Sequence, residues 1–488
     1  MKKSLALILT LALLGLNLNM TAYAAVKPGD KCETKGISKV VKGKKYTCVK
    51  SNKKLIWSKG VNVAKPSQSE TPLVLTPQPA AQPSAPEPAP TATPQPKPSN
   101  ASMSYQSPSE PSSNVELCKV KENNSNRRNS LFELPTGFPG TSALATKTGT
   151  VKWALIPIDF PDMKGEPNFK SRVDNQMKQL SDWYFTVSDG KFKVEWVVAD
   201  NWVTLPGNTS QYEIKQSVNL DNAANGTKLF KDAMGAADPI FNFSGIQTVN
   251  FILPLGQKFV GESSQGFPWD AAVKAMSTNE GKISSYSIPG DFFNQLERQY
   301  WSYWAHEFGH AMGVPHIGSS REPNPFMNLD LMGNQDGYAK ELSGWHRFVN
   351  GWLDDQKVYC QPMSSLKSTE LTLVPLSDSA SGLKMTVVPV SESKAIVVES
   401  RRETQFSCTM PSKKNGVLVY LYDATKSHGE NYLIPVTPAG RNAEGSSNCP
   451  VFPYPDPLIY MDQSISIEGI KIEVLESKEF DKIRISKL

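Results

Sequence analysis

The chain has 488 residues, of which 39% are hydrophobic and 20% charged, and its formal net charge is +5. This length suffices for two or three domains, and the apolar content suffices for a packed core. So small an excess of positive charge argues against nucleic acid as a partner.

The first 24 residues have the pattern of a cleaved signal peptide. Lys2 and Lys3 precede an apolar run from Leu5 to Leu16, and Ala22-Tyr23-Ala24 supplies the small residues that a signal peptidase needs. The alternative is a membrane anchor that is never cut, but the apolar run is short for one. No later segment approaches the roughly 20 apolar residues of a transmembrane helix. We therefore expect a secreted, extracellular protein without a transmembrane segment after cleavage.

Residues 25–60 are predicted to form a small basic module. The range 26–60 contains eleven lysines but only two acidic residues, and alternating patterns around Tyr46–Val49 and Leu55–Trp57 indicate short strands. A unit this small needs a covalent staple, which Cys32–Cys48 would supply. The lysines suit an anionic cell-envelope polymer, which would associate the protein with the cell wall. A solvated spacer module is the equally simple alternative.

Residues 61–116 are predicted to be a disordered linker. Proline, serine, alanine, glutamine and threonine dominate this stretch, and such a composition cannot bury enough apolar surface to fold. We expect an extended, semi-rigid spacer.

The rest of the chain predicts an α+β fold in two parts. Residues 117–357 alternate strand and helix patterns, whereas 358–488 read as an all-β, sandwich-like domain. The elements predicted in the first part are strand 151–158, helix 169–185, strand 192–198, helix 221–234, strand 249–255 and helix 296–312. Those predicted in the second part include strands 383–390, 395–399, 416–422 and 470–475.

Six cysteines fit disulfide bonds in an oxidising compartment. Besides Cys32–Cys48, we expect Cys408–Cys449, which leaves Cys118 to pair with Cys360. Six cysteines allow 15 pairings, so this connectivity is a hypothesis. An unpaired Cys118 that blocks a metal is the alternative, and the even count argues against it.

The segment His306-Glu307-Phe308-Gly309-His310-Ala311-Met312-Gly313-Val314-Pro315-His316 holds three of the five histidines. Residues four apart lie on one helix face, so His306 and His310 can bind one metal ion. Gly313 suits the end of a helix, after which His316 can return as a third ligand. Three protein ligands leave one position open, which is typical of a catalytic zinc site.

Glu307 is the predicted general base. It follows a ligand directly and would take a proton from water that zinc activates, then pass it to the leaving amine of a peptide bond. The alternative is a core helix whose histidines satisfy local hydrogen bonds, or a structural metal site. The third histidine makes the catalytic interpretation the stronger one.

The histidine motif resembles that of the metzincin zinc peptidases, which carry a methionine turn beneath the metal. Met332, in Asp330-Leu331-Met332-Gly333, fits this turn, and Met327 is the competing candidate. The resemblance implies a zinc peptidase domain with a mixed sheet and an active-site helix.

Over residues 150–435 the chain is most similar to the immune inhibitor A-like branch of secreted bacterial peptidases. The similar segments are 155–162, 184–206, 342–345 and 351–353. This resemblance implies β structure after the peptidase domain and extracellular protein substrates. Asn334 stands where some metzincins have a tyrosine. Tyr338 or His346 could stabilise the transition state instead, although a surface or packing role explains each of them better.

A calcium ion is a weaker expectation. Asp330, Asp336 and Asp354–Asp355 offer the carboxylate oxygens that calcium prefers, although turns explain them equally well. The leading hypothesis is a secreted zinc-dependent endopeptidase. The alternative is a cell-surface binding or adhesion protein with an inactive peptidase-like domain, and the presence of Glu307 favours the enzyme.

Overall fold

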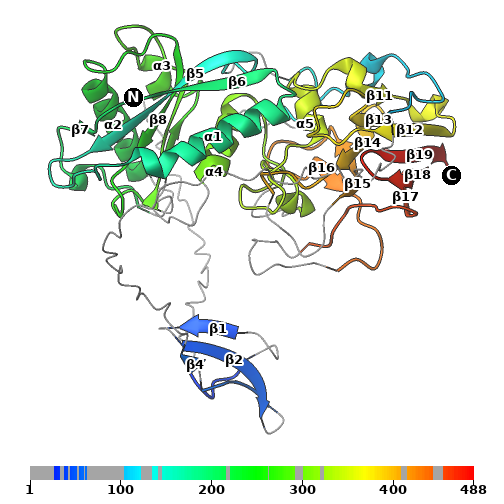
Figure 1. The fold of residues 1–488 in the computed structure, drawn as a ribbon, viewed down its shortest axis with the longest axis horizontal. Helices are drawn as coiled ribbons and strands as arrows, with labels where there is room; N and C mark the ends of the chain where they lie inside the picture. The colour runs from blue at the N-terminus through cyan, green and yellow to red at the C-terminus, as the bar shows by residue number, and fades with distance from the viewer. Residues whose placement is uncertain are drawn as a thin grey trace, which may run out of the picture. The chain divides into compact units, whose positions relative to one another are not determined.

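The protein is described by a computed structural model (Figure 1). The described residues are 27–32, 38–41, 44–51, 54–59, 61–62, 104–122, 134–140, 145–215, 220–261, 263–291, 300–318, 324–407, 415–442 and 454–488. The chain divides into two compact units, Met1–Gln95 and Pro96–Leu488. The predicted signal peptide and the predicted Cys408–Cys449 bond lie outside the described residues.

The small unit is a β-sheet held by a disulfide bond. Its strands are β1 (Ser38–Val41), β2 (Lys44–Ser51), β3 (Lys54–Trp57) and β4 (Val61–Asn62), with β2 pairing antiparallel to the other three. The Cys32–Cys48 bond is present and packs with Trp57 to form the only apolar cluster described in this unit. The predicted strands and disulfide are therefore confirmed.

The large unit begins with a mixed sheet in the order β6-β5-β8-β10-β9, with β7 also pairing with β5. All of these pairs are parallel except that of the edge strand β9 with β10. The strands are β5 (Gly149–Asp159), β6 (Phe192–Val198), β7 (Val203–Thr204), β8 (Ile246–Ile252), β9 (Ser264–Gly266) and β10 (Ser285–Ile288). The predicted strands at 151–158, 192–198 and 249–255 correspond to β5, β6 and β8.

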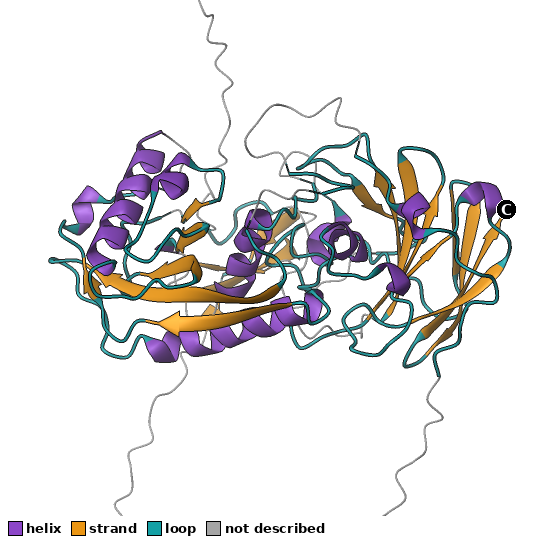
Figure 2. Cartoon of the chain, turned by 90° about the horizontal axis from the view of Figure 1, so that it is seen from above, coloured by secondary structure: helices purple, strands orange, loops and turns teal. Residues whose placement is uncertain are grey.

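Helices cover both faces of this sheet (Figures 1 and 2). Alternate residues of β5 divide between two clusters, because successive side chains of a strand point to opposite faces. Trp153 packs with α1 (Lys170–Val187) and α4 (Tyr300–Ala311), whereas Ile156 packs with α2 (Leu220–Ala237) and the short α3 (Ala271–Ala275). The aromatic side of α4 is thereby fixed against the sheet.

The second part of the large unit consists of two sheets. The first has the order β11-β13-β14-β15-β16 and the second has the order β12-β19-β18-β17. The strands are β11 (Val358–Cys360), β12 (Thr369–Leu373), β13 (Met385–Pro389), β14 (Lys394–Arg401), β15 (Gly416–Asp423), β16 (Leu433–Pro435), β17 (Ser464–Ile467), β18 (Ile470–Ser477) and β19 (Asp481–Lys487). The mixed α and β composition predicted from the sequence is confirmed.

Both faces of the five-stranded sheet are buried. Val419 and its neighbours on one face pack against the second sheet, and Tyr420 and its neighbours on the other face pack against Trp345 of α5 (Gly344–Val349). The other helical segments among the described residues are α5 and five short 3-10 helices. These are Val115–Cys118, Thr209–Gln211, Pro325–Asn328, Asp355–Lys357 and Met363–Ser365. The predicted junction at 357/358 therefore falls inside a continuous core.

The end of the predicted linker is part of the large unit. Ser113 donates from its backbone to the carbonyl of Cys360, and Tyr105 packs against the cluster between the two sheets. Cys118 and Cys360 are joined by a disulfide, as predicted, which excludes Cys118 as a metal-blocking thiol. The described residues at both ends of the predicted linker thus belong to folded units, because Val61–Asn62 form β4 and Ser113 binds β11.

None of the helices in the described part of the chain has the length and apolar character needed to cross a bilayer.

Candidate metal centre

Helix α4 places the first two histidines and then stops. Gly313 has φ of +95° and donates to the carbonyl of His310, while Val314 donates to that of Gly309. This pair of hydrogen bonds is the glycine-terminated helix end that the sequence predicts. Because the chain reverses there, His316 returns toward the face of α4 that carries His306 and His310.

The three predicted ligands converge. The Nε2 atom of His316 lies 2.8 Å from Nε2 of His306 and 2.9 Å from Nε2 of His310. These three residues form the one group of metal-ligating side chains found among the described residues, with ligand atoms all within 4.8 Å of one another.

The surroundings of the histidines fit a metal ion. His306 Nδ1 lies 2.8 Å from the carbonyl of Leu331, and His310 Nδ1 lies 2.8 Å from the carbonyl of Val314. A carbonyl can only accept, so each Nδ1 carries the hydrogen and each Nε2 presents a lone pair to the centre. Lone pairs that face one another repel unless a cation lies between them. Carbonyls that orient ligating imidazoles in this way are typical of zinc sites.

Burial keeps these imidazoles neutral, which is the form that binds metal. It lowers the pKa of His306, and it holds the pKa values of His310 and His316 well below that of free imidazole, with the neighbouring histidines acting in the same direction. The donor set and its protonation state therefore both suit zinc.

Glu307 lies on the same helix, one residue after the first ligand. Burial raises the pKa of its carboxyl to about 7, and a hydrogen bond with Tyr303 opposes that rise. Tyr303 therefore helps to keep the carboxylate form available. A carboxyl group with a pKa near neutrality can both take and return a proton, as a general base must.

Of the two methionines, Met332 lies beneath the site. Its sulfur is the nearest atom, at 3.1 Å, to the place where a Cβ on Gly309 would stand, and its side chain is buried. The turn that contains Met332 also supplies the Leu331 carbonyl that orients His306. Met327 lies instead in the short helix Pro325–Asn328, which precedes this turn.

The structure places neither predicted transition-state stabiliser with the histidines. Tyr338 is buried in the cluster around Trp345. His346 is buried as well, with Nε2 2.6 Å from the hydroxyl of Tyr432 and Nδ1 3.5 Å from Asp330. Both side chains therefore lie in packed surroundings, which agrees with the packing role considered for them.

Asp330, one of the residues considered for calcium, has its oxygens engaged by the protein. Oδ1 accepts from the backbone N–H of Met332 at 2.8 Å, and Oδ2 accepts from that of Ser343 at 2.6 Å. Asp336 lies in the loop that follows, where its backbone donates to Asn334. Asp330 thus acts as a buried turn residue that ties the methionine turn to the start of α5.

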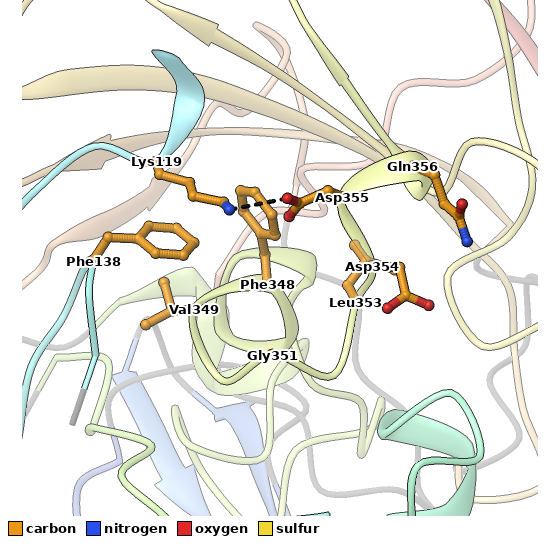
Figure 3. A pocket seen from close by; sticks show the side chains of 9 residues that line it. All are labelled: Lys119, Phe138, Phe348, Val349, Gly351, Leu353, Asp354, Asp355 and Gln356. Atoms are coloured by element: carbon orange, nitrogen blue, oxygen red, sulfur yellow. Dashed lines mark hydrogen bonds and ion pairs between the residues drawn. The ribbon is translucent and has the colours of Figure 1, made fainter. Parts of the chain in front are cut away.

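Asp354 and Asp355 line a cavity of about 600 Å³ (Figure 3). Lys119 pairs with Asp355 at 3.0 Å, and Lys191 pairs with Asp354 at 2.6 Å. Each carboxylate therefore already has a cationic partner from the protein. None of the three histidine ligands lines this cavity.

One residue near the metal site was not predicted. His428 follows β15, and its ring centroid lies 5.1 Å from that of His316 and 5.9 Å from that of His310. Burial lowers the pKa of His428 to about 4, with His306 acting in the same direction. No local motif marks this histidine, so only the rarity of histidine in the chain could have drawn attention to it.

A His-Glu-x-x-His helix with a third converging histidine defines the class of this protein. The chain is a metallopeptidase with a zinc-binding histidine triad. Residues 286–379 match the model of the Peptidase M66 family, and this range, less than half of the chain, includes all three histidines and Met332.

No curated protein matches the chain. Among solved structures, it is similar to wild-type OgpA from Akkermansia muciniphila, with 11% identity and a TM-score of 0.26 over 58% of this chain and 85% of that one. It is also similar to metalloproteinase-II from Bacteroides fragilis, with 15% identity and a TM-score of 0.23 over 46% of this chain and 57% of that one. Likenesses this slight carry no argument about fold or substrate. The family model that matches is that of Peptidase M66. It does not test the resemblance to the immune inhibitor A-like branch, which stays a prediction.

Proposed function

We propose that the chain is a secreted zinc-dependent endopeptidase of metzincin type that hydrolyses peptide bonds of extracellular proteins. The observation that carries this proposal is the convergence of three Nε2 atoms at the helix that carries Glu307, whose pKa desolvation raises to about 7. No fourth ligand joins the triad among the described residues. An open position of this kind is what a catalytic zinc site needs.

His306, His310 and His316 would hold the ion. When bound, zinc supplies a Lewis acid that activates water and polarises the scissile carbonyl. Glu307 takes the proton of the attacking water on a carboxylate oxygen and returns it to the amine that leaves. The carbonyls of Leu331 and Val314 keep two of the imidazoles in the tautomer that ligation requires.

Secretion and an extracellular substrate are supported by the N-terminal pattern and by two disulfides. The lysine-rich small unit supports an association with an anionic cell-envelope polymer. The adhesion-protein alternative shares these features but predicts no turnover.

The proposal is tested with the mature protein and casein as substrate. Removing metal with 1,10-phenanthroline should abolish cleavage, and adding back zinc should restore it. Glu307→Gln should lower kcat by at least about 10²-fold, because it removes the group that accepts the proton. The same variant should retain one zinc per chain.

Tyr303→Phe is the matched control, since it removes the hydroxyl that contacts Glu307 but leaves the carboxyl in place. We expect a far smaller loss of kcat in this variant than in Glu307→Gln. Full activity of Glu307→Gln, or cleavage that persists without metal, would contradict the proposal.

A further inference from the structure

Four of the five histidines in the chain gather at one place, and the mechanism above uses only three of them. The fourth, His428, is on the segment between β15 and β16, in the β-rich part of the large unit. Its ring stands beside the rings of His316 and His310.

Hydrogen bonds fix the loop that carries His428 to the loop that carries the third ligand. Gly429 donates to the carbonyl of His316 at 3.2 Å, and Gly318 donates to the carbonyl of Glu430 at 3.1 Å. Tyr432 donates its hydroxyl to the carbonyl of Pro315 at 3.3 Å. Each loop donates a hydrogen bond to the other, and these bonds hold His428 close to His316.

One ring nitrogen of His428 makes no hydrogen bond within the described part of the protein. Its Nδ1 atom is buried and has no hydrogen-bond partner there. An unpaired buried nitrogen costs about 1–3 kcal/mol, so a site that keeps one usually gains a partner when it is occupied. Water or substrate at the metal site would be such a partner.

The position of His428 does not fit a fourth ligand. The rings of the three ligands are 4.2–4.9 Å apart, whereas the distances from the ring of His428 to those of His316 and His310 are 5.1 and 5.9 Å. Among the described residues, the cluster of converging ligand atoms contains His306, His310 and His316 only. His428 therefore lies beside the three ligands without joining their cluster.

We propose that His428 is a further catalytic residue, whose N–H contacts the scissile carbonyl oxygen and stabilises the negative charge that develops there. This inference rests on the proposed peptidase function. When water attacks, a bond forms to the carbonyl carbon and an electron pair moves onto the carbonyl oxygen. His428 donates a hydrogen bond to that oxygen and transfers no proton, because Glu307 holds the proton of the water. Groups aimed at such developing charge are worth about 10²–10³-fold in kcat.

The first measurement is casein cleavage by full-length variants. His428→Ala should lower kcat about 10²-fold with little change in KM, and His428→Gln, which keeps an N–H donor, should recover part of that loss. Lys426→Ala changes the same loop two residues away and should match the parent. An unchanged kcat in His428→Ala overturns the proposal.

The second measurement does not depend on turnover. In the cobalt-substituted protein, the visible spectrum should be the same for the parent and His428→Ala, because the ligands are unchanged. The affinity for acetohydroxamate, which binds metal ions through its carbonyl and N–O⁻ oxygens, should fall about tenfold in His428→Ala. A changed spectrum or a loss of bound metal would show that His428 is a ligand, which also overturns the proposal.

The two proposals fail in different ways. If the zinc-loaded parent cleaves no protein, the proposed function fails, while the acetohydroxamate titration still reports whether His428 reaches the open position. If the parent cleaves casein but His428→Ala changes neither kcat nor acetohydroxamate affinity, only the role of His428 fails.

Discussion

At the scale of single residues, the metal site depends on a buried carboxylate beneath it. Asp330 accepts two backbone N–H groups and lies against His346, and Leu331, the next residue, orients His306. Burial alone would raise the pKa of Asp330, but His346 and the two backbone donors together bring it below the ordinary value. The interactions of the ionised form therefore outweigh its desolvation.

We expect Asp330→Asn to lower the free energy of unfolding by about 1–3 kcal/mol at pH 7, because a neutral amide accepts these hydrogen bonds less well. A carboxyl group whose folded pKa is depressed contributes its stabilisation above about pH 4, the usual pKa of Asp in an unfolded chain. That contribution is lost as the pH falls through the lower folded pKa. Urea unfolding of the parent and the variant at pH 7 and pH 3 measures both effects.

Asp200→Asn is the control for the same chemical change at an exposed position, where the carboxylate pairs with Lys170 at 2.9 Å. Exposed pairs are worth about 0–1 kcal/mol, so this variant should unfold almost as the parent does. Equal losses in the two variants would contradict a special role for Asp330.

The residues of the site that could be predicted are those whose placement is local. His306, His310 and Gly313 follow from helix geometry alone, since their spacing decides which face they share and where the helix ends. His428 could not be predicted, because tertiary hydrogen bonds between two loops bring it to the site. Tyr338 and His346 are buried, Tyr338 in the cluster around Trp345 and His346 against Tyr432, so long-range packing decides their surroundings as well.

At the scale of elements, the long strands and helices were predictable from periodicity, whereas the shortest ones were not. β5 and α1 carry enough residues to show a pattern of burial. The two- and three-residue strands β7, β9 and β16 exist only through their partners, so no local signal predicts them. Pairing across the sheet, rather than propensity, decides such strands.

The Cys118–Cys360 bond ties the segment before the mixed sheet to the first strand of the β-rich part, across a sequence separation of 242 residues. Both cysteines are fully buried. We expect the double variant Cys118→Ser/Cys360→Ser to lose about 2–5 kcal/mol of stability, because its unfolded chain is no longer constrained by this long loop. Denaturant unfolding followed by tryptophan fluorescence measures the loss.

Cys32→Ser/Cys48→Ser provides the comparison, because that bond lies in the other compact unit. It should leave the unfolding of the large unit unchanged while the small unit loses its staple. If both double variants destabilised the large unit equally, the long-range bond would have no particular importance for the stability of that unit.

At the scale of the whole molecule, the contacts divide the chain after Gln95, within the stretch whose composition predicts a linker, and they show no division at residue 357. The low apolar content of residues 61–95 marks a division that the contacts also show. At residue 357 no such change of composition occurs, and α5 and the five-stranded sheet share one apolar cluster. β14 and β15 are buried on both faces, so each needs a partner layer on either side.

Two truncations should therefore behave in opposite ways. A chain without residues 25–95 should fold and keep the kcat/KM of the full chain, because these residues belong to a separate compact unit. It should also lose the salt-dependent retention on immobilised dextran sulfate that the lysines of the small unit are expected to give. Equal retention of both chains would contradict the proposed role of the basic unit.

A chain that ends at residue 357 should fail to give a soluble peptidase. The truncation uncovers Trp345 and Phe348, whose apolar surface lies against β13, β14 and β15, and it removes Cys360 and His428. Each uncovered large side chain costs about 1.5–3 kcal/mol, and a protein stable by only 5–15 kcal/mol cannot lose several such contacts together with a disulfide. Expression of both truncated chains under the same conditions, followed by size-exclusion chromatography and casein cleavage, tests this. A soluble, active chain ending at 357 would show that the β-rich part is a separate domain, and it would also remove His428 from the catalytic site.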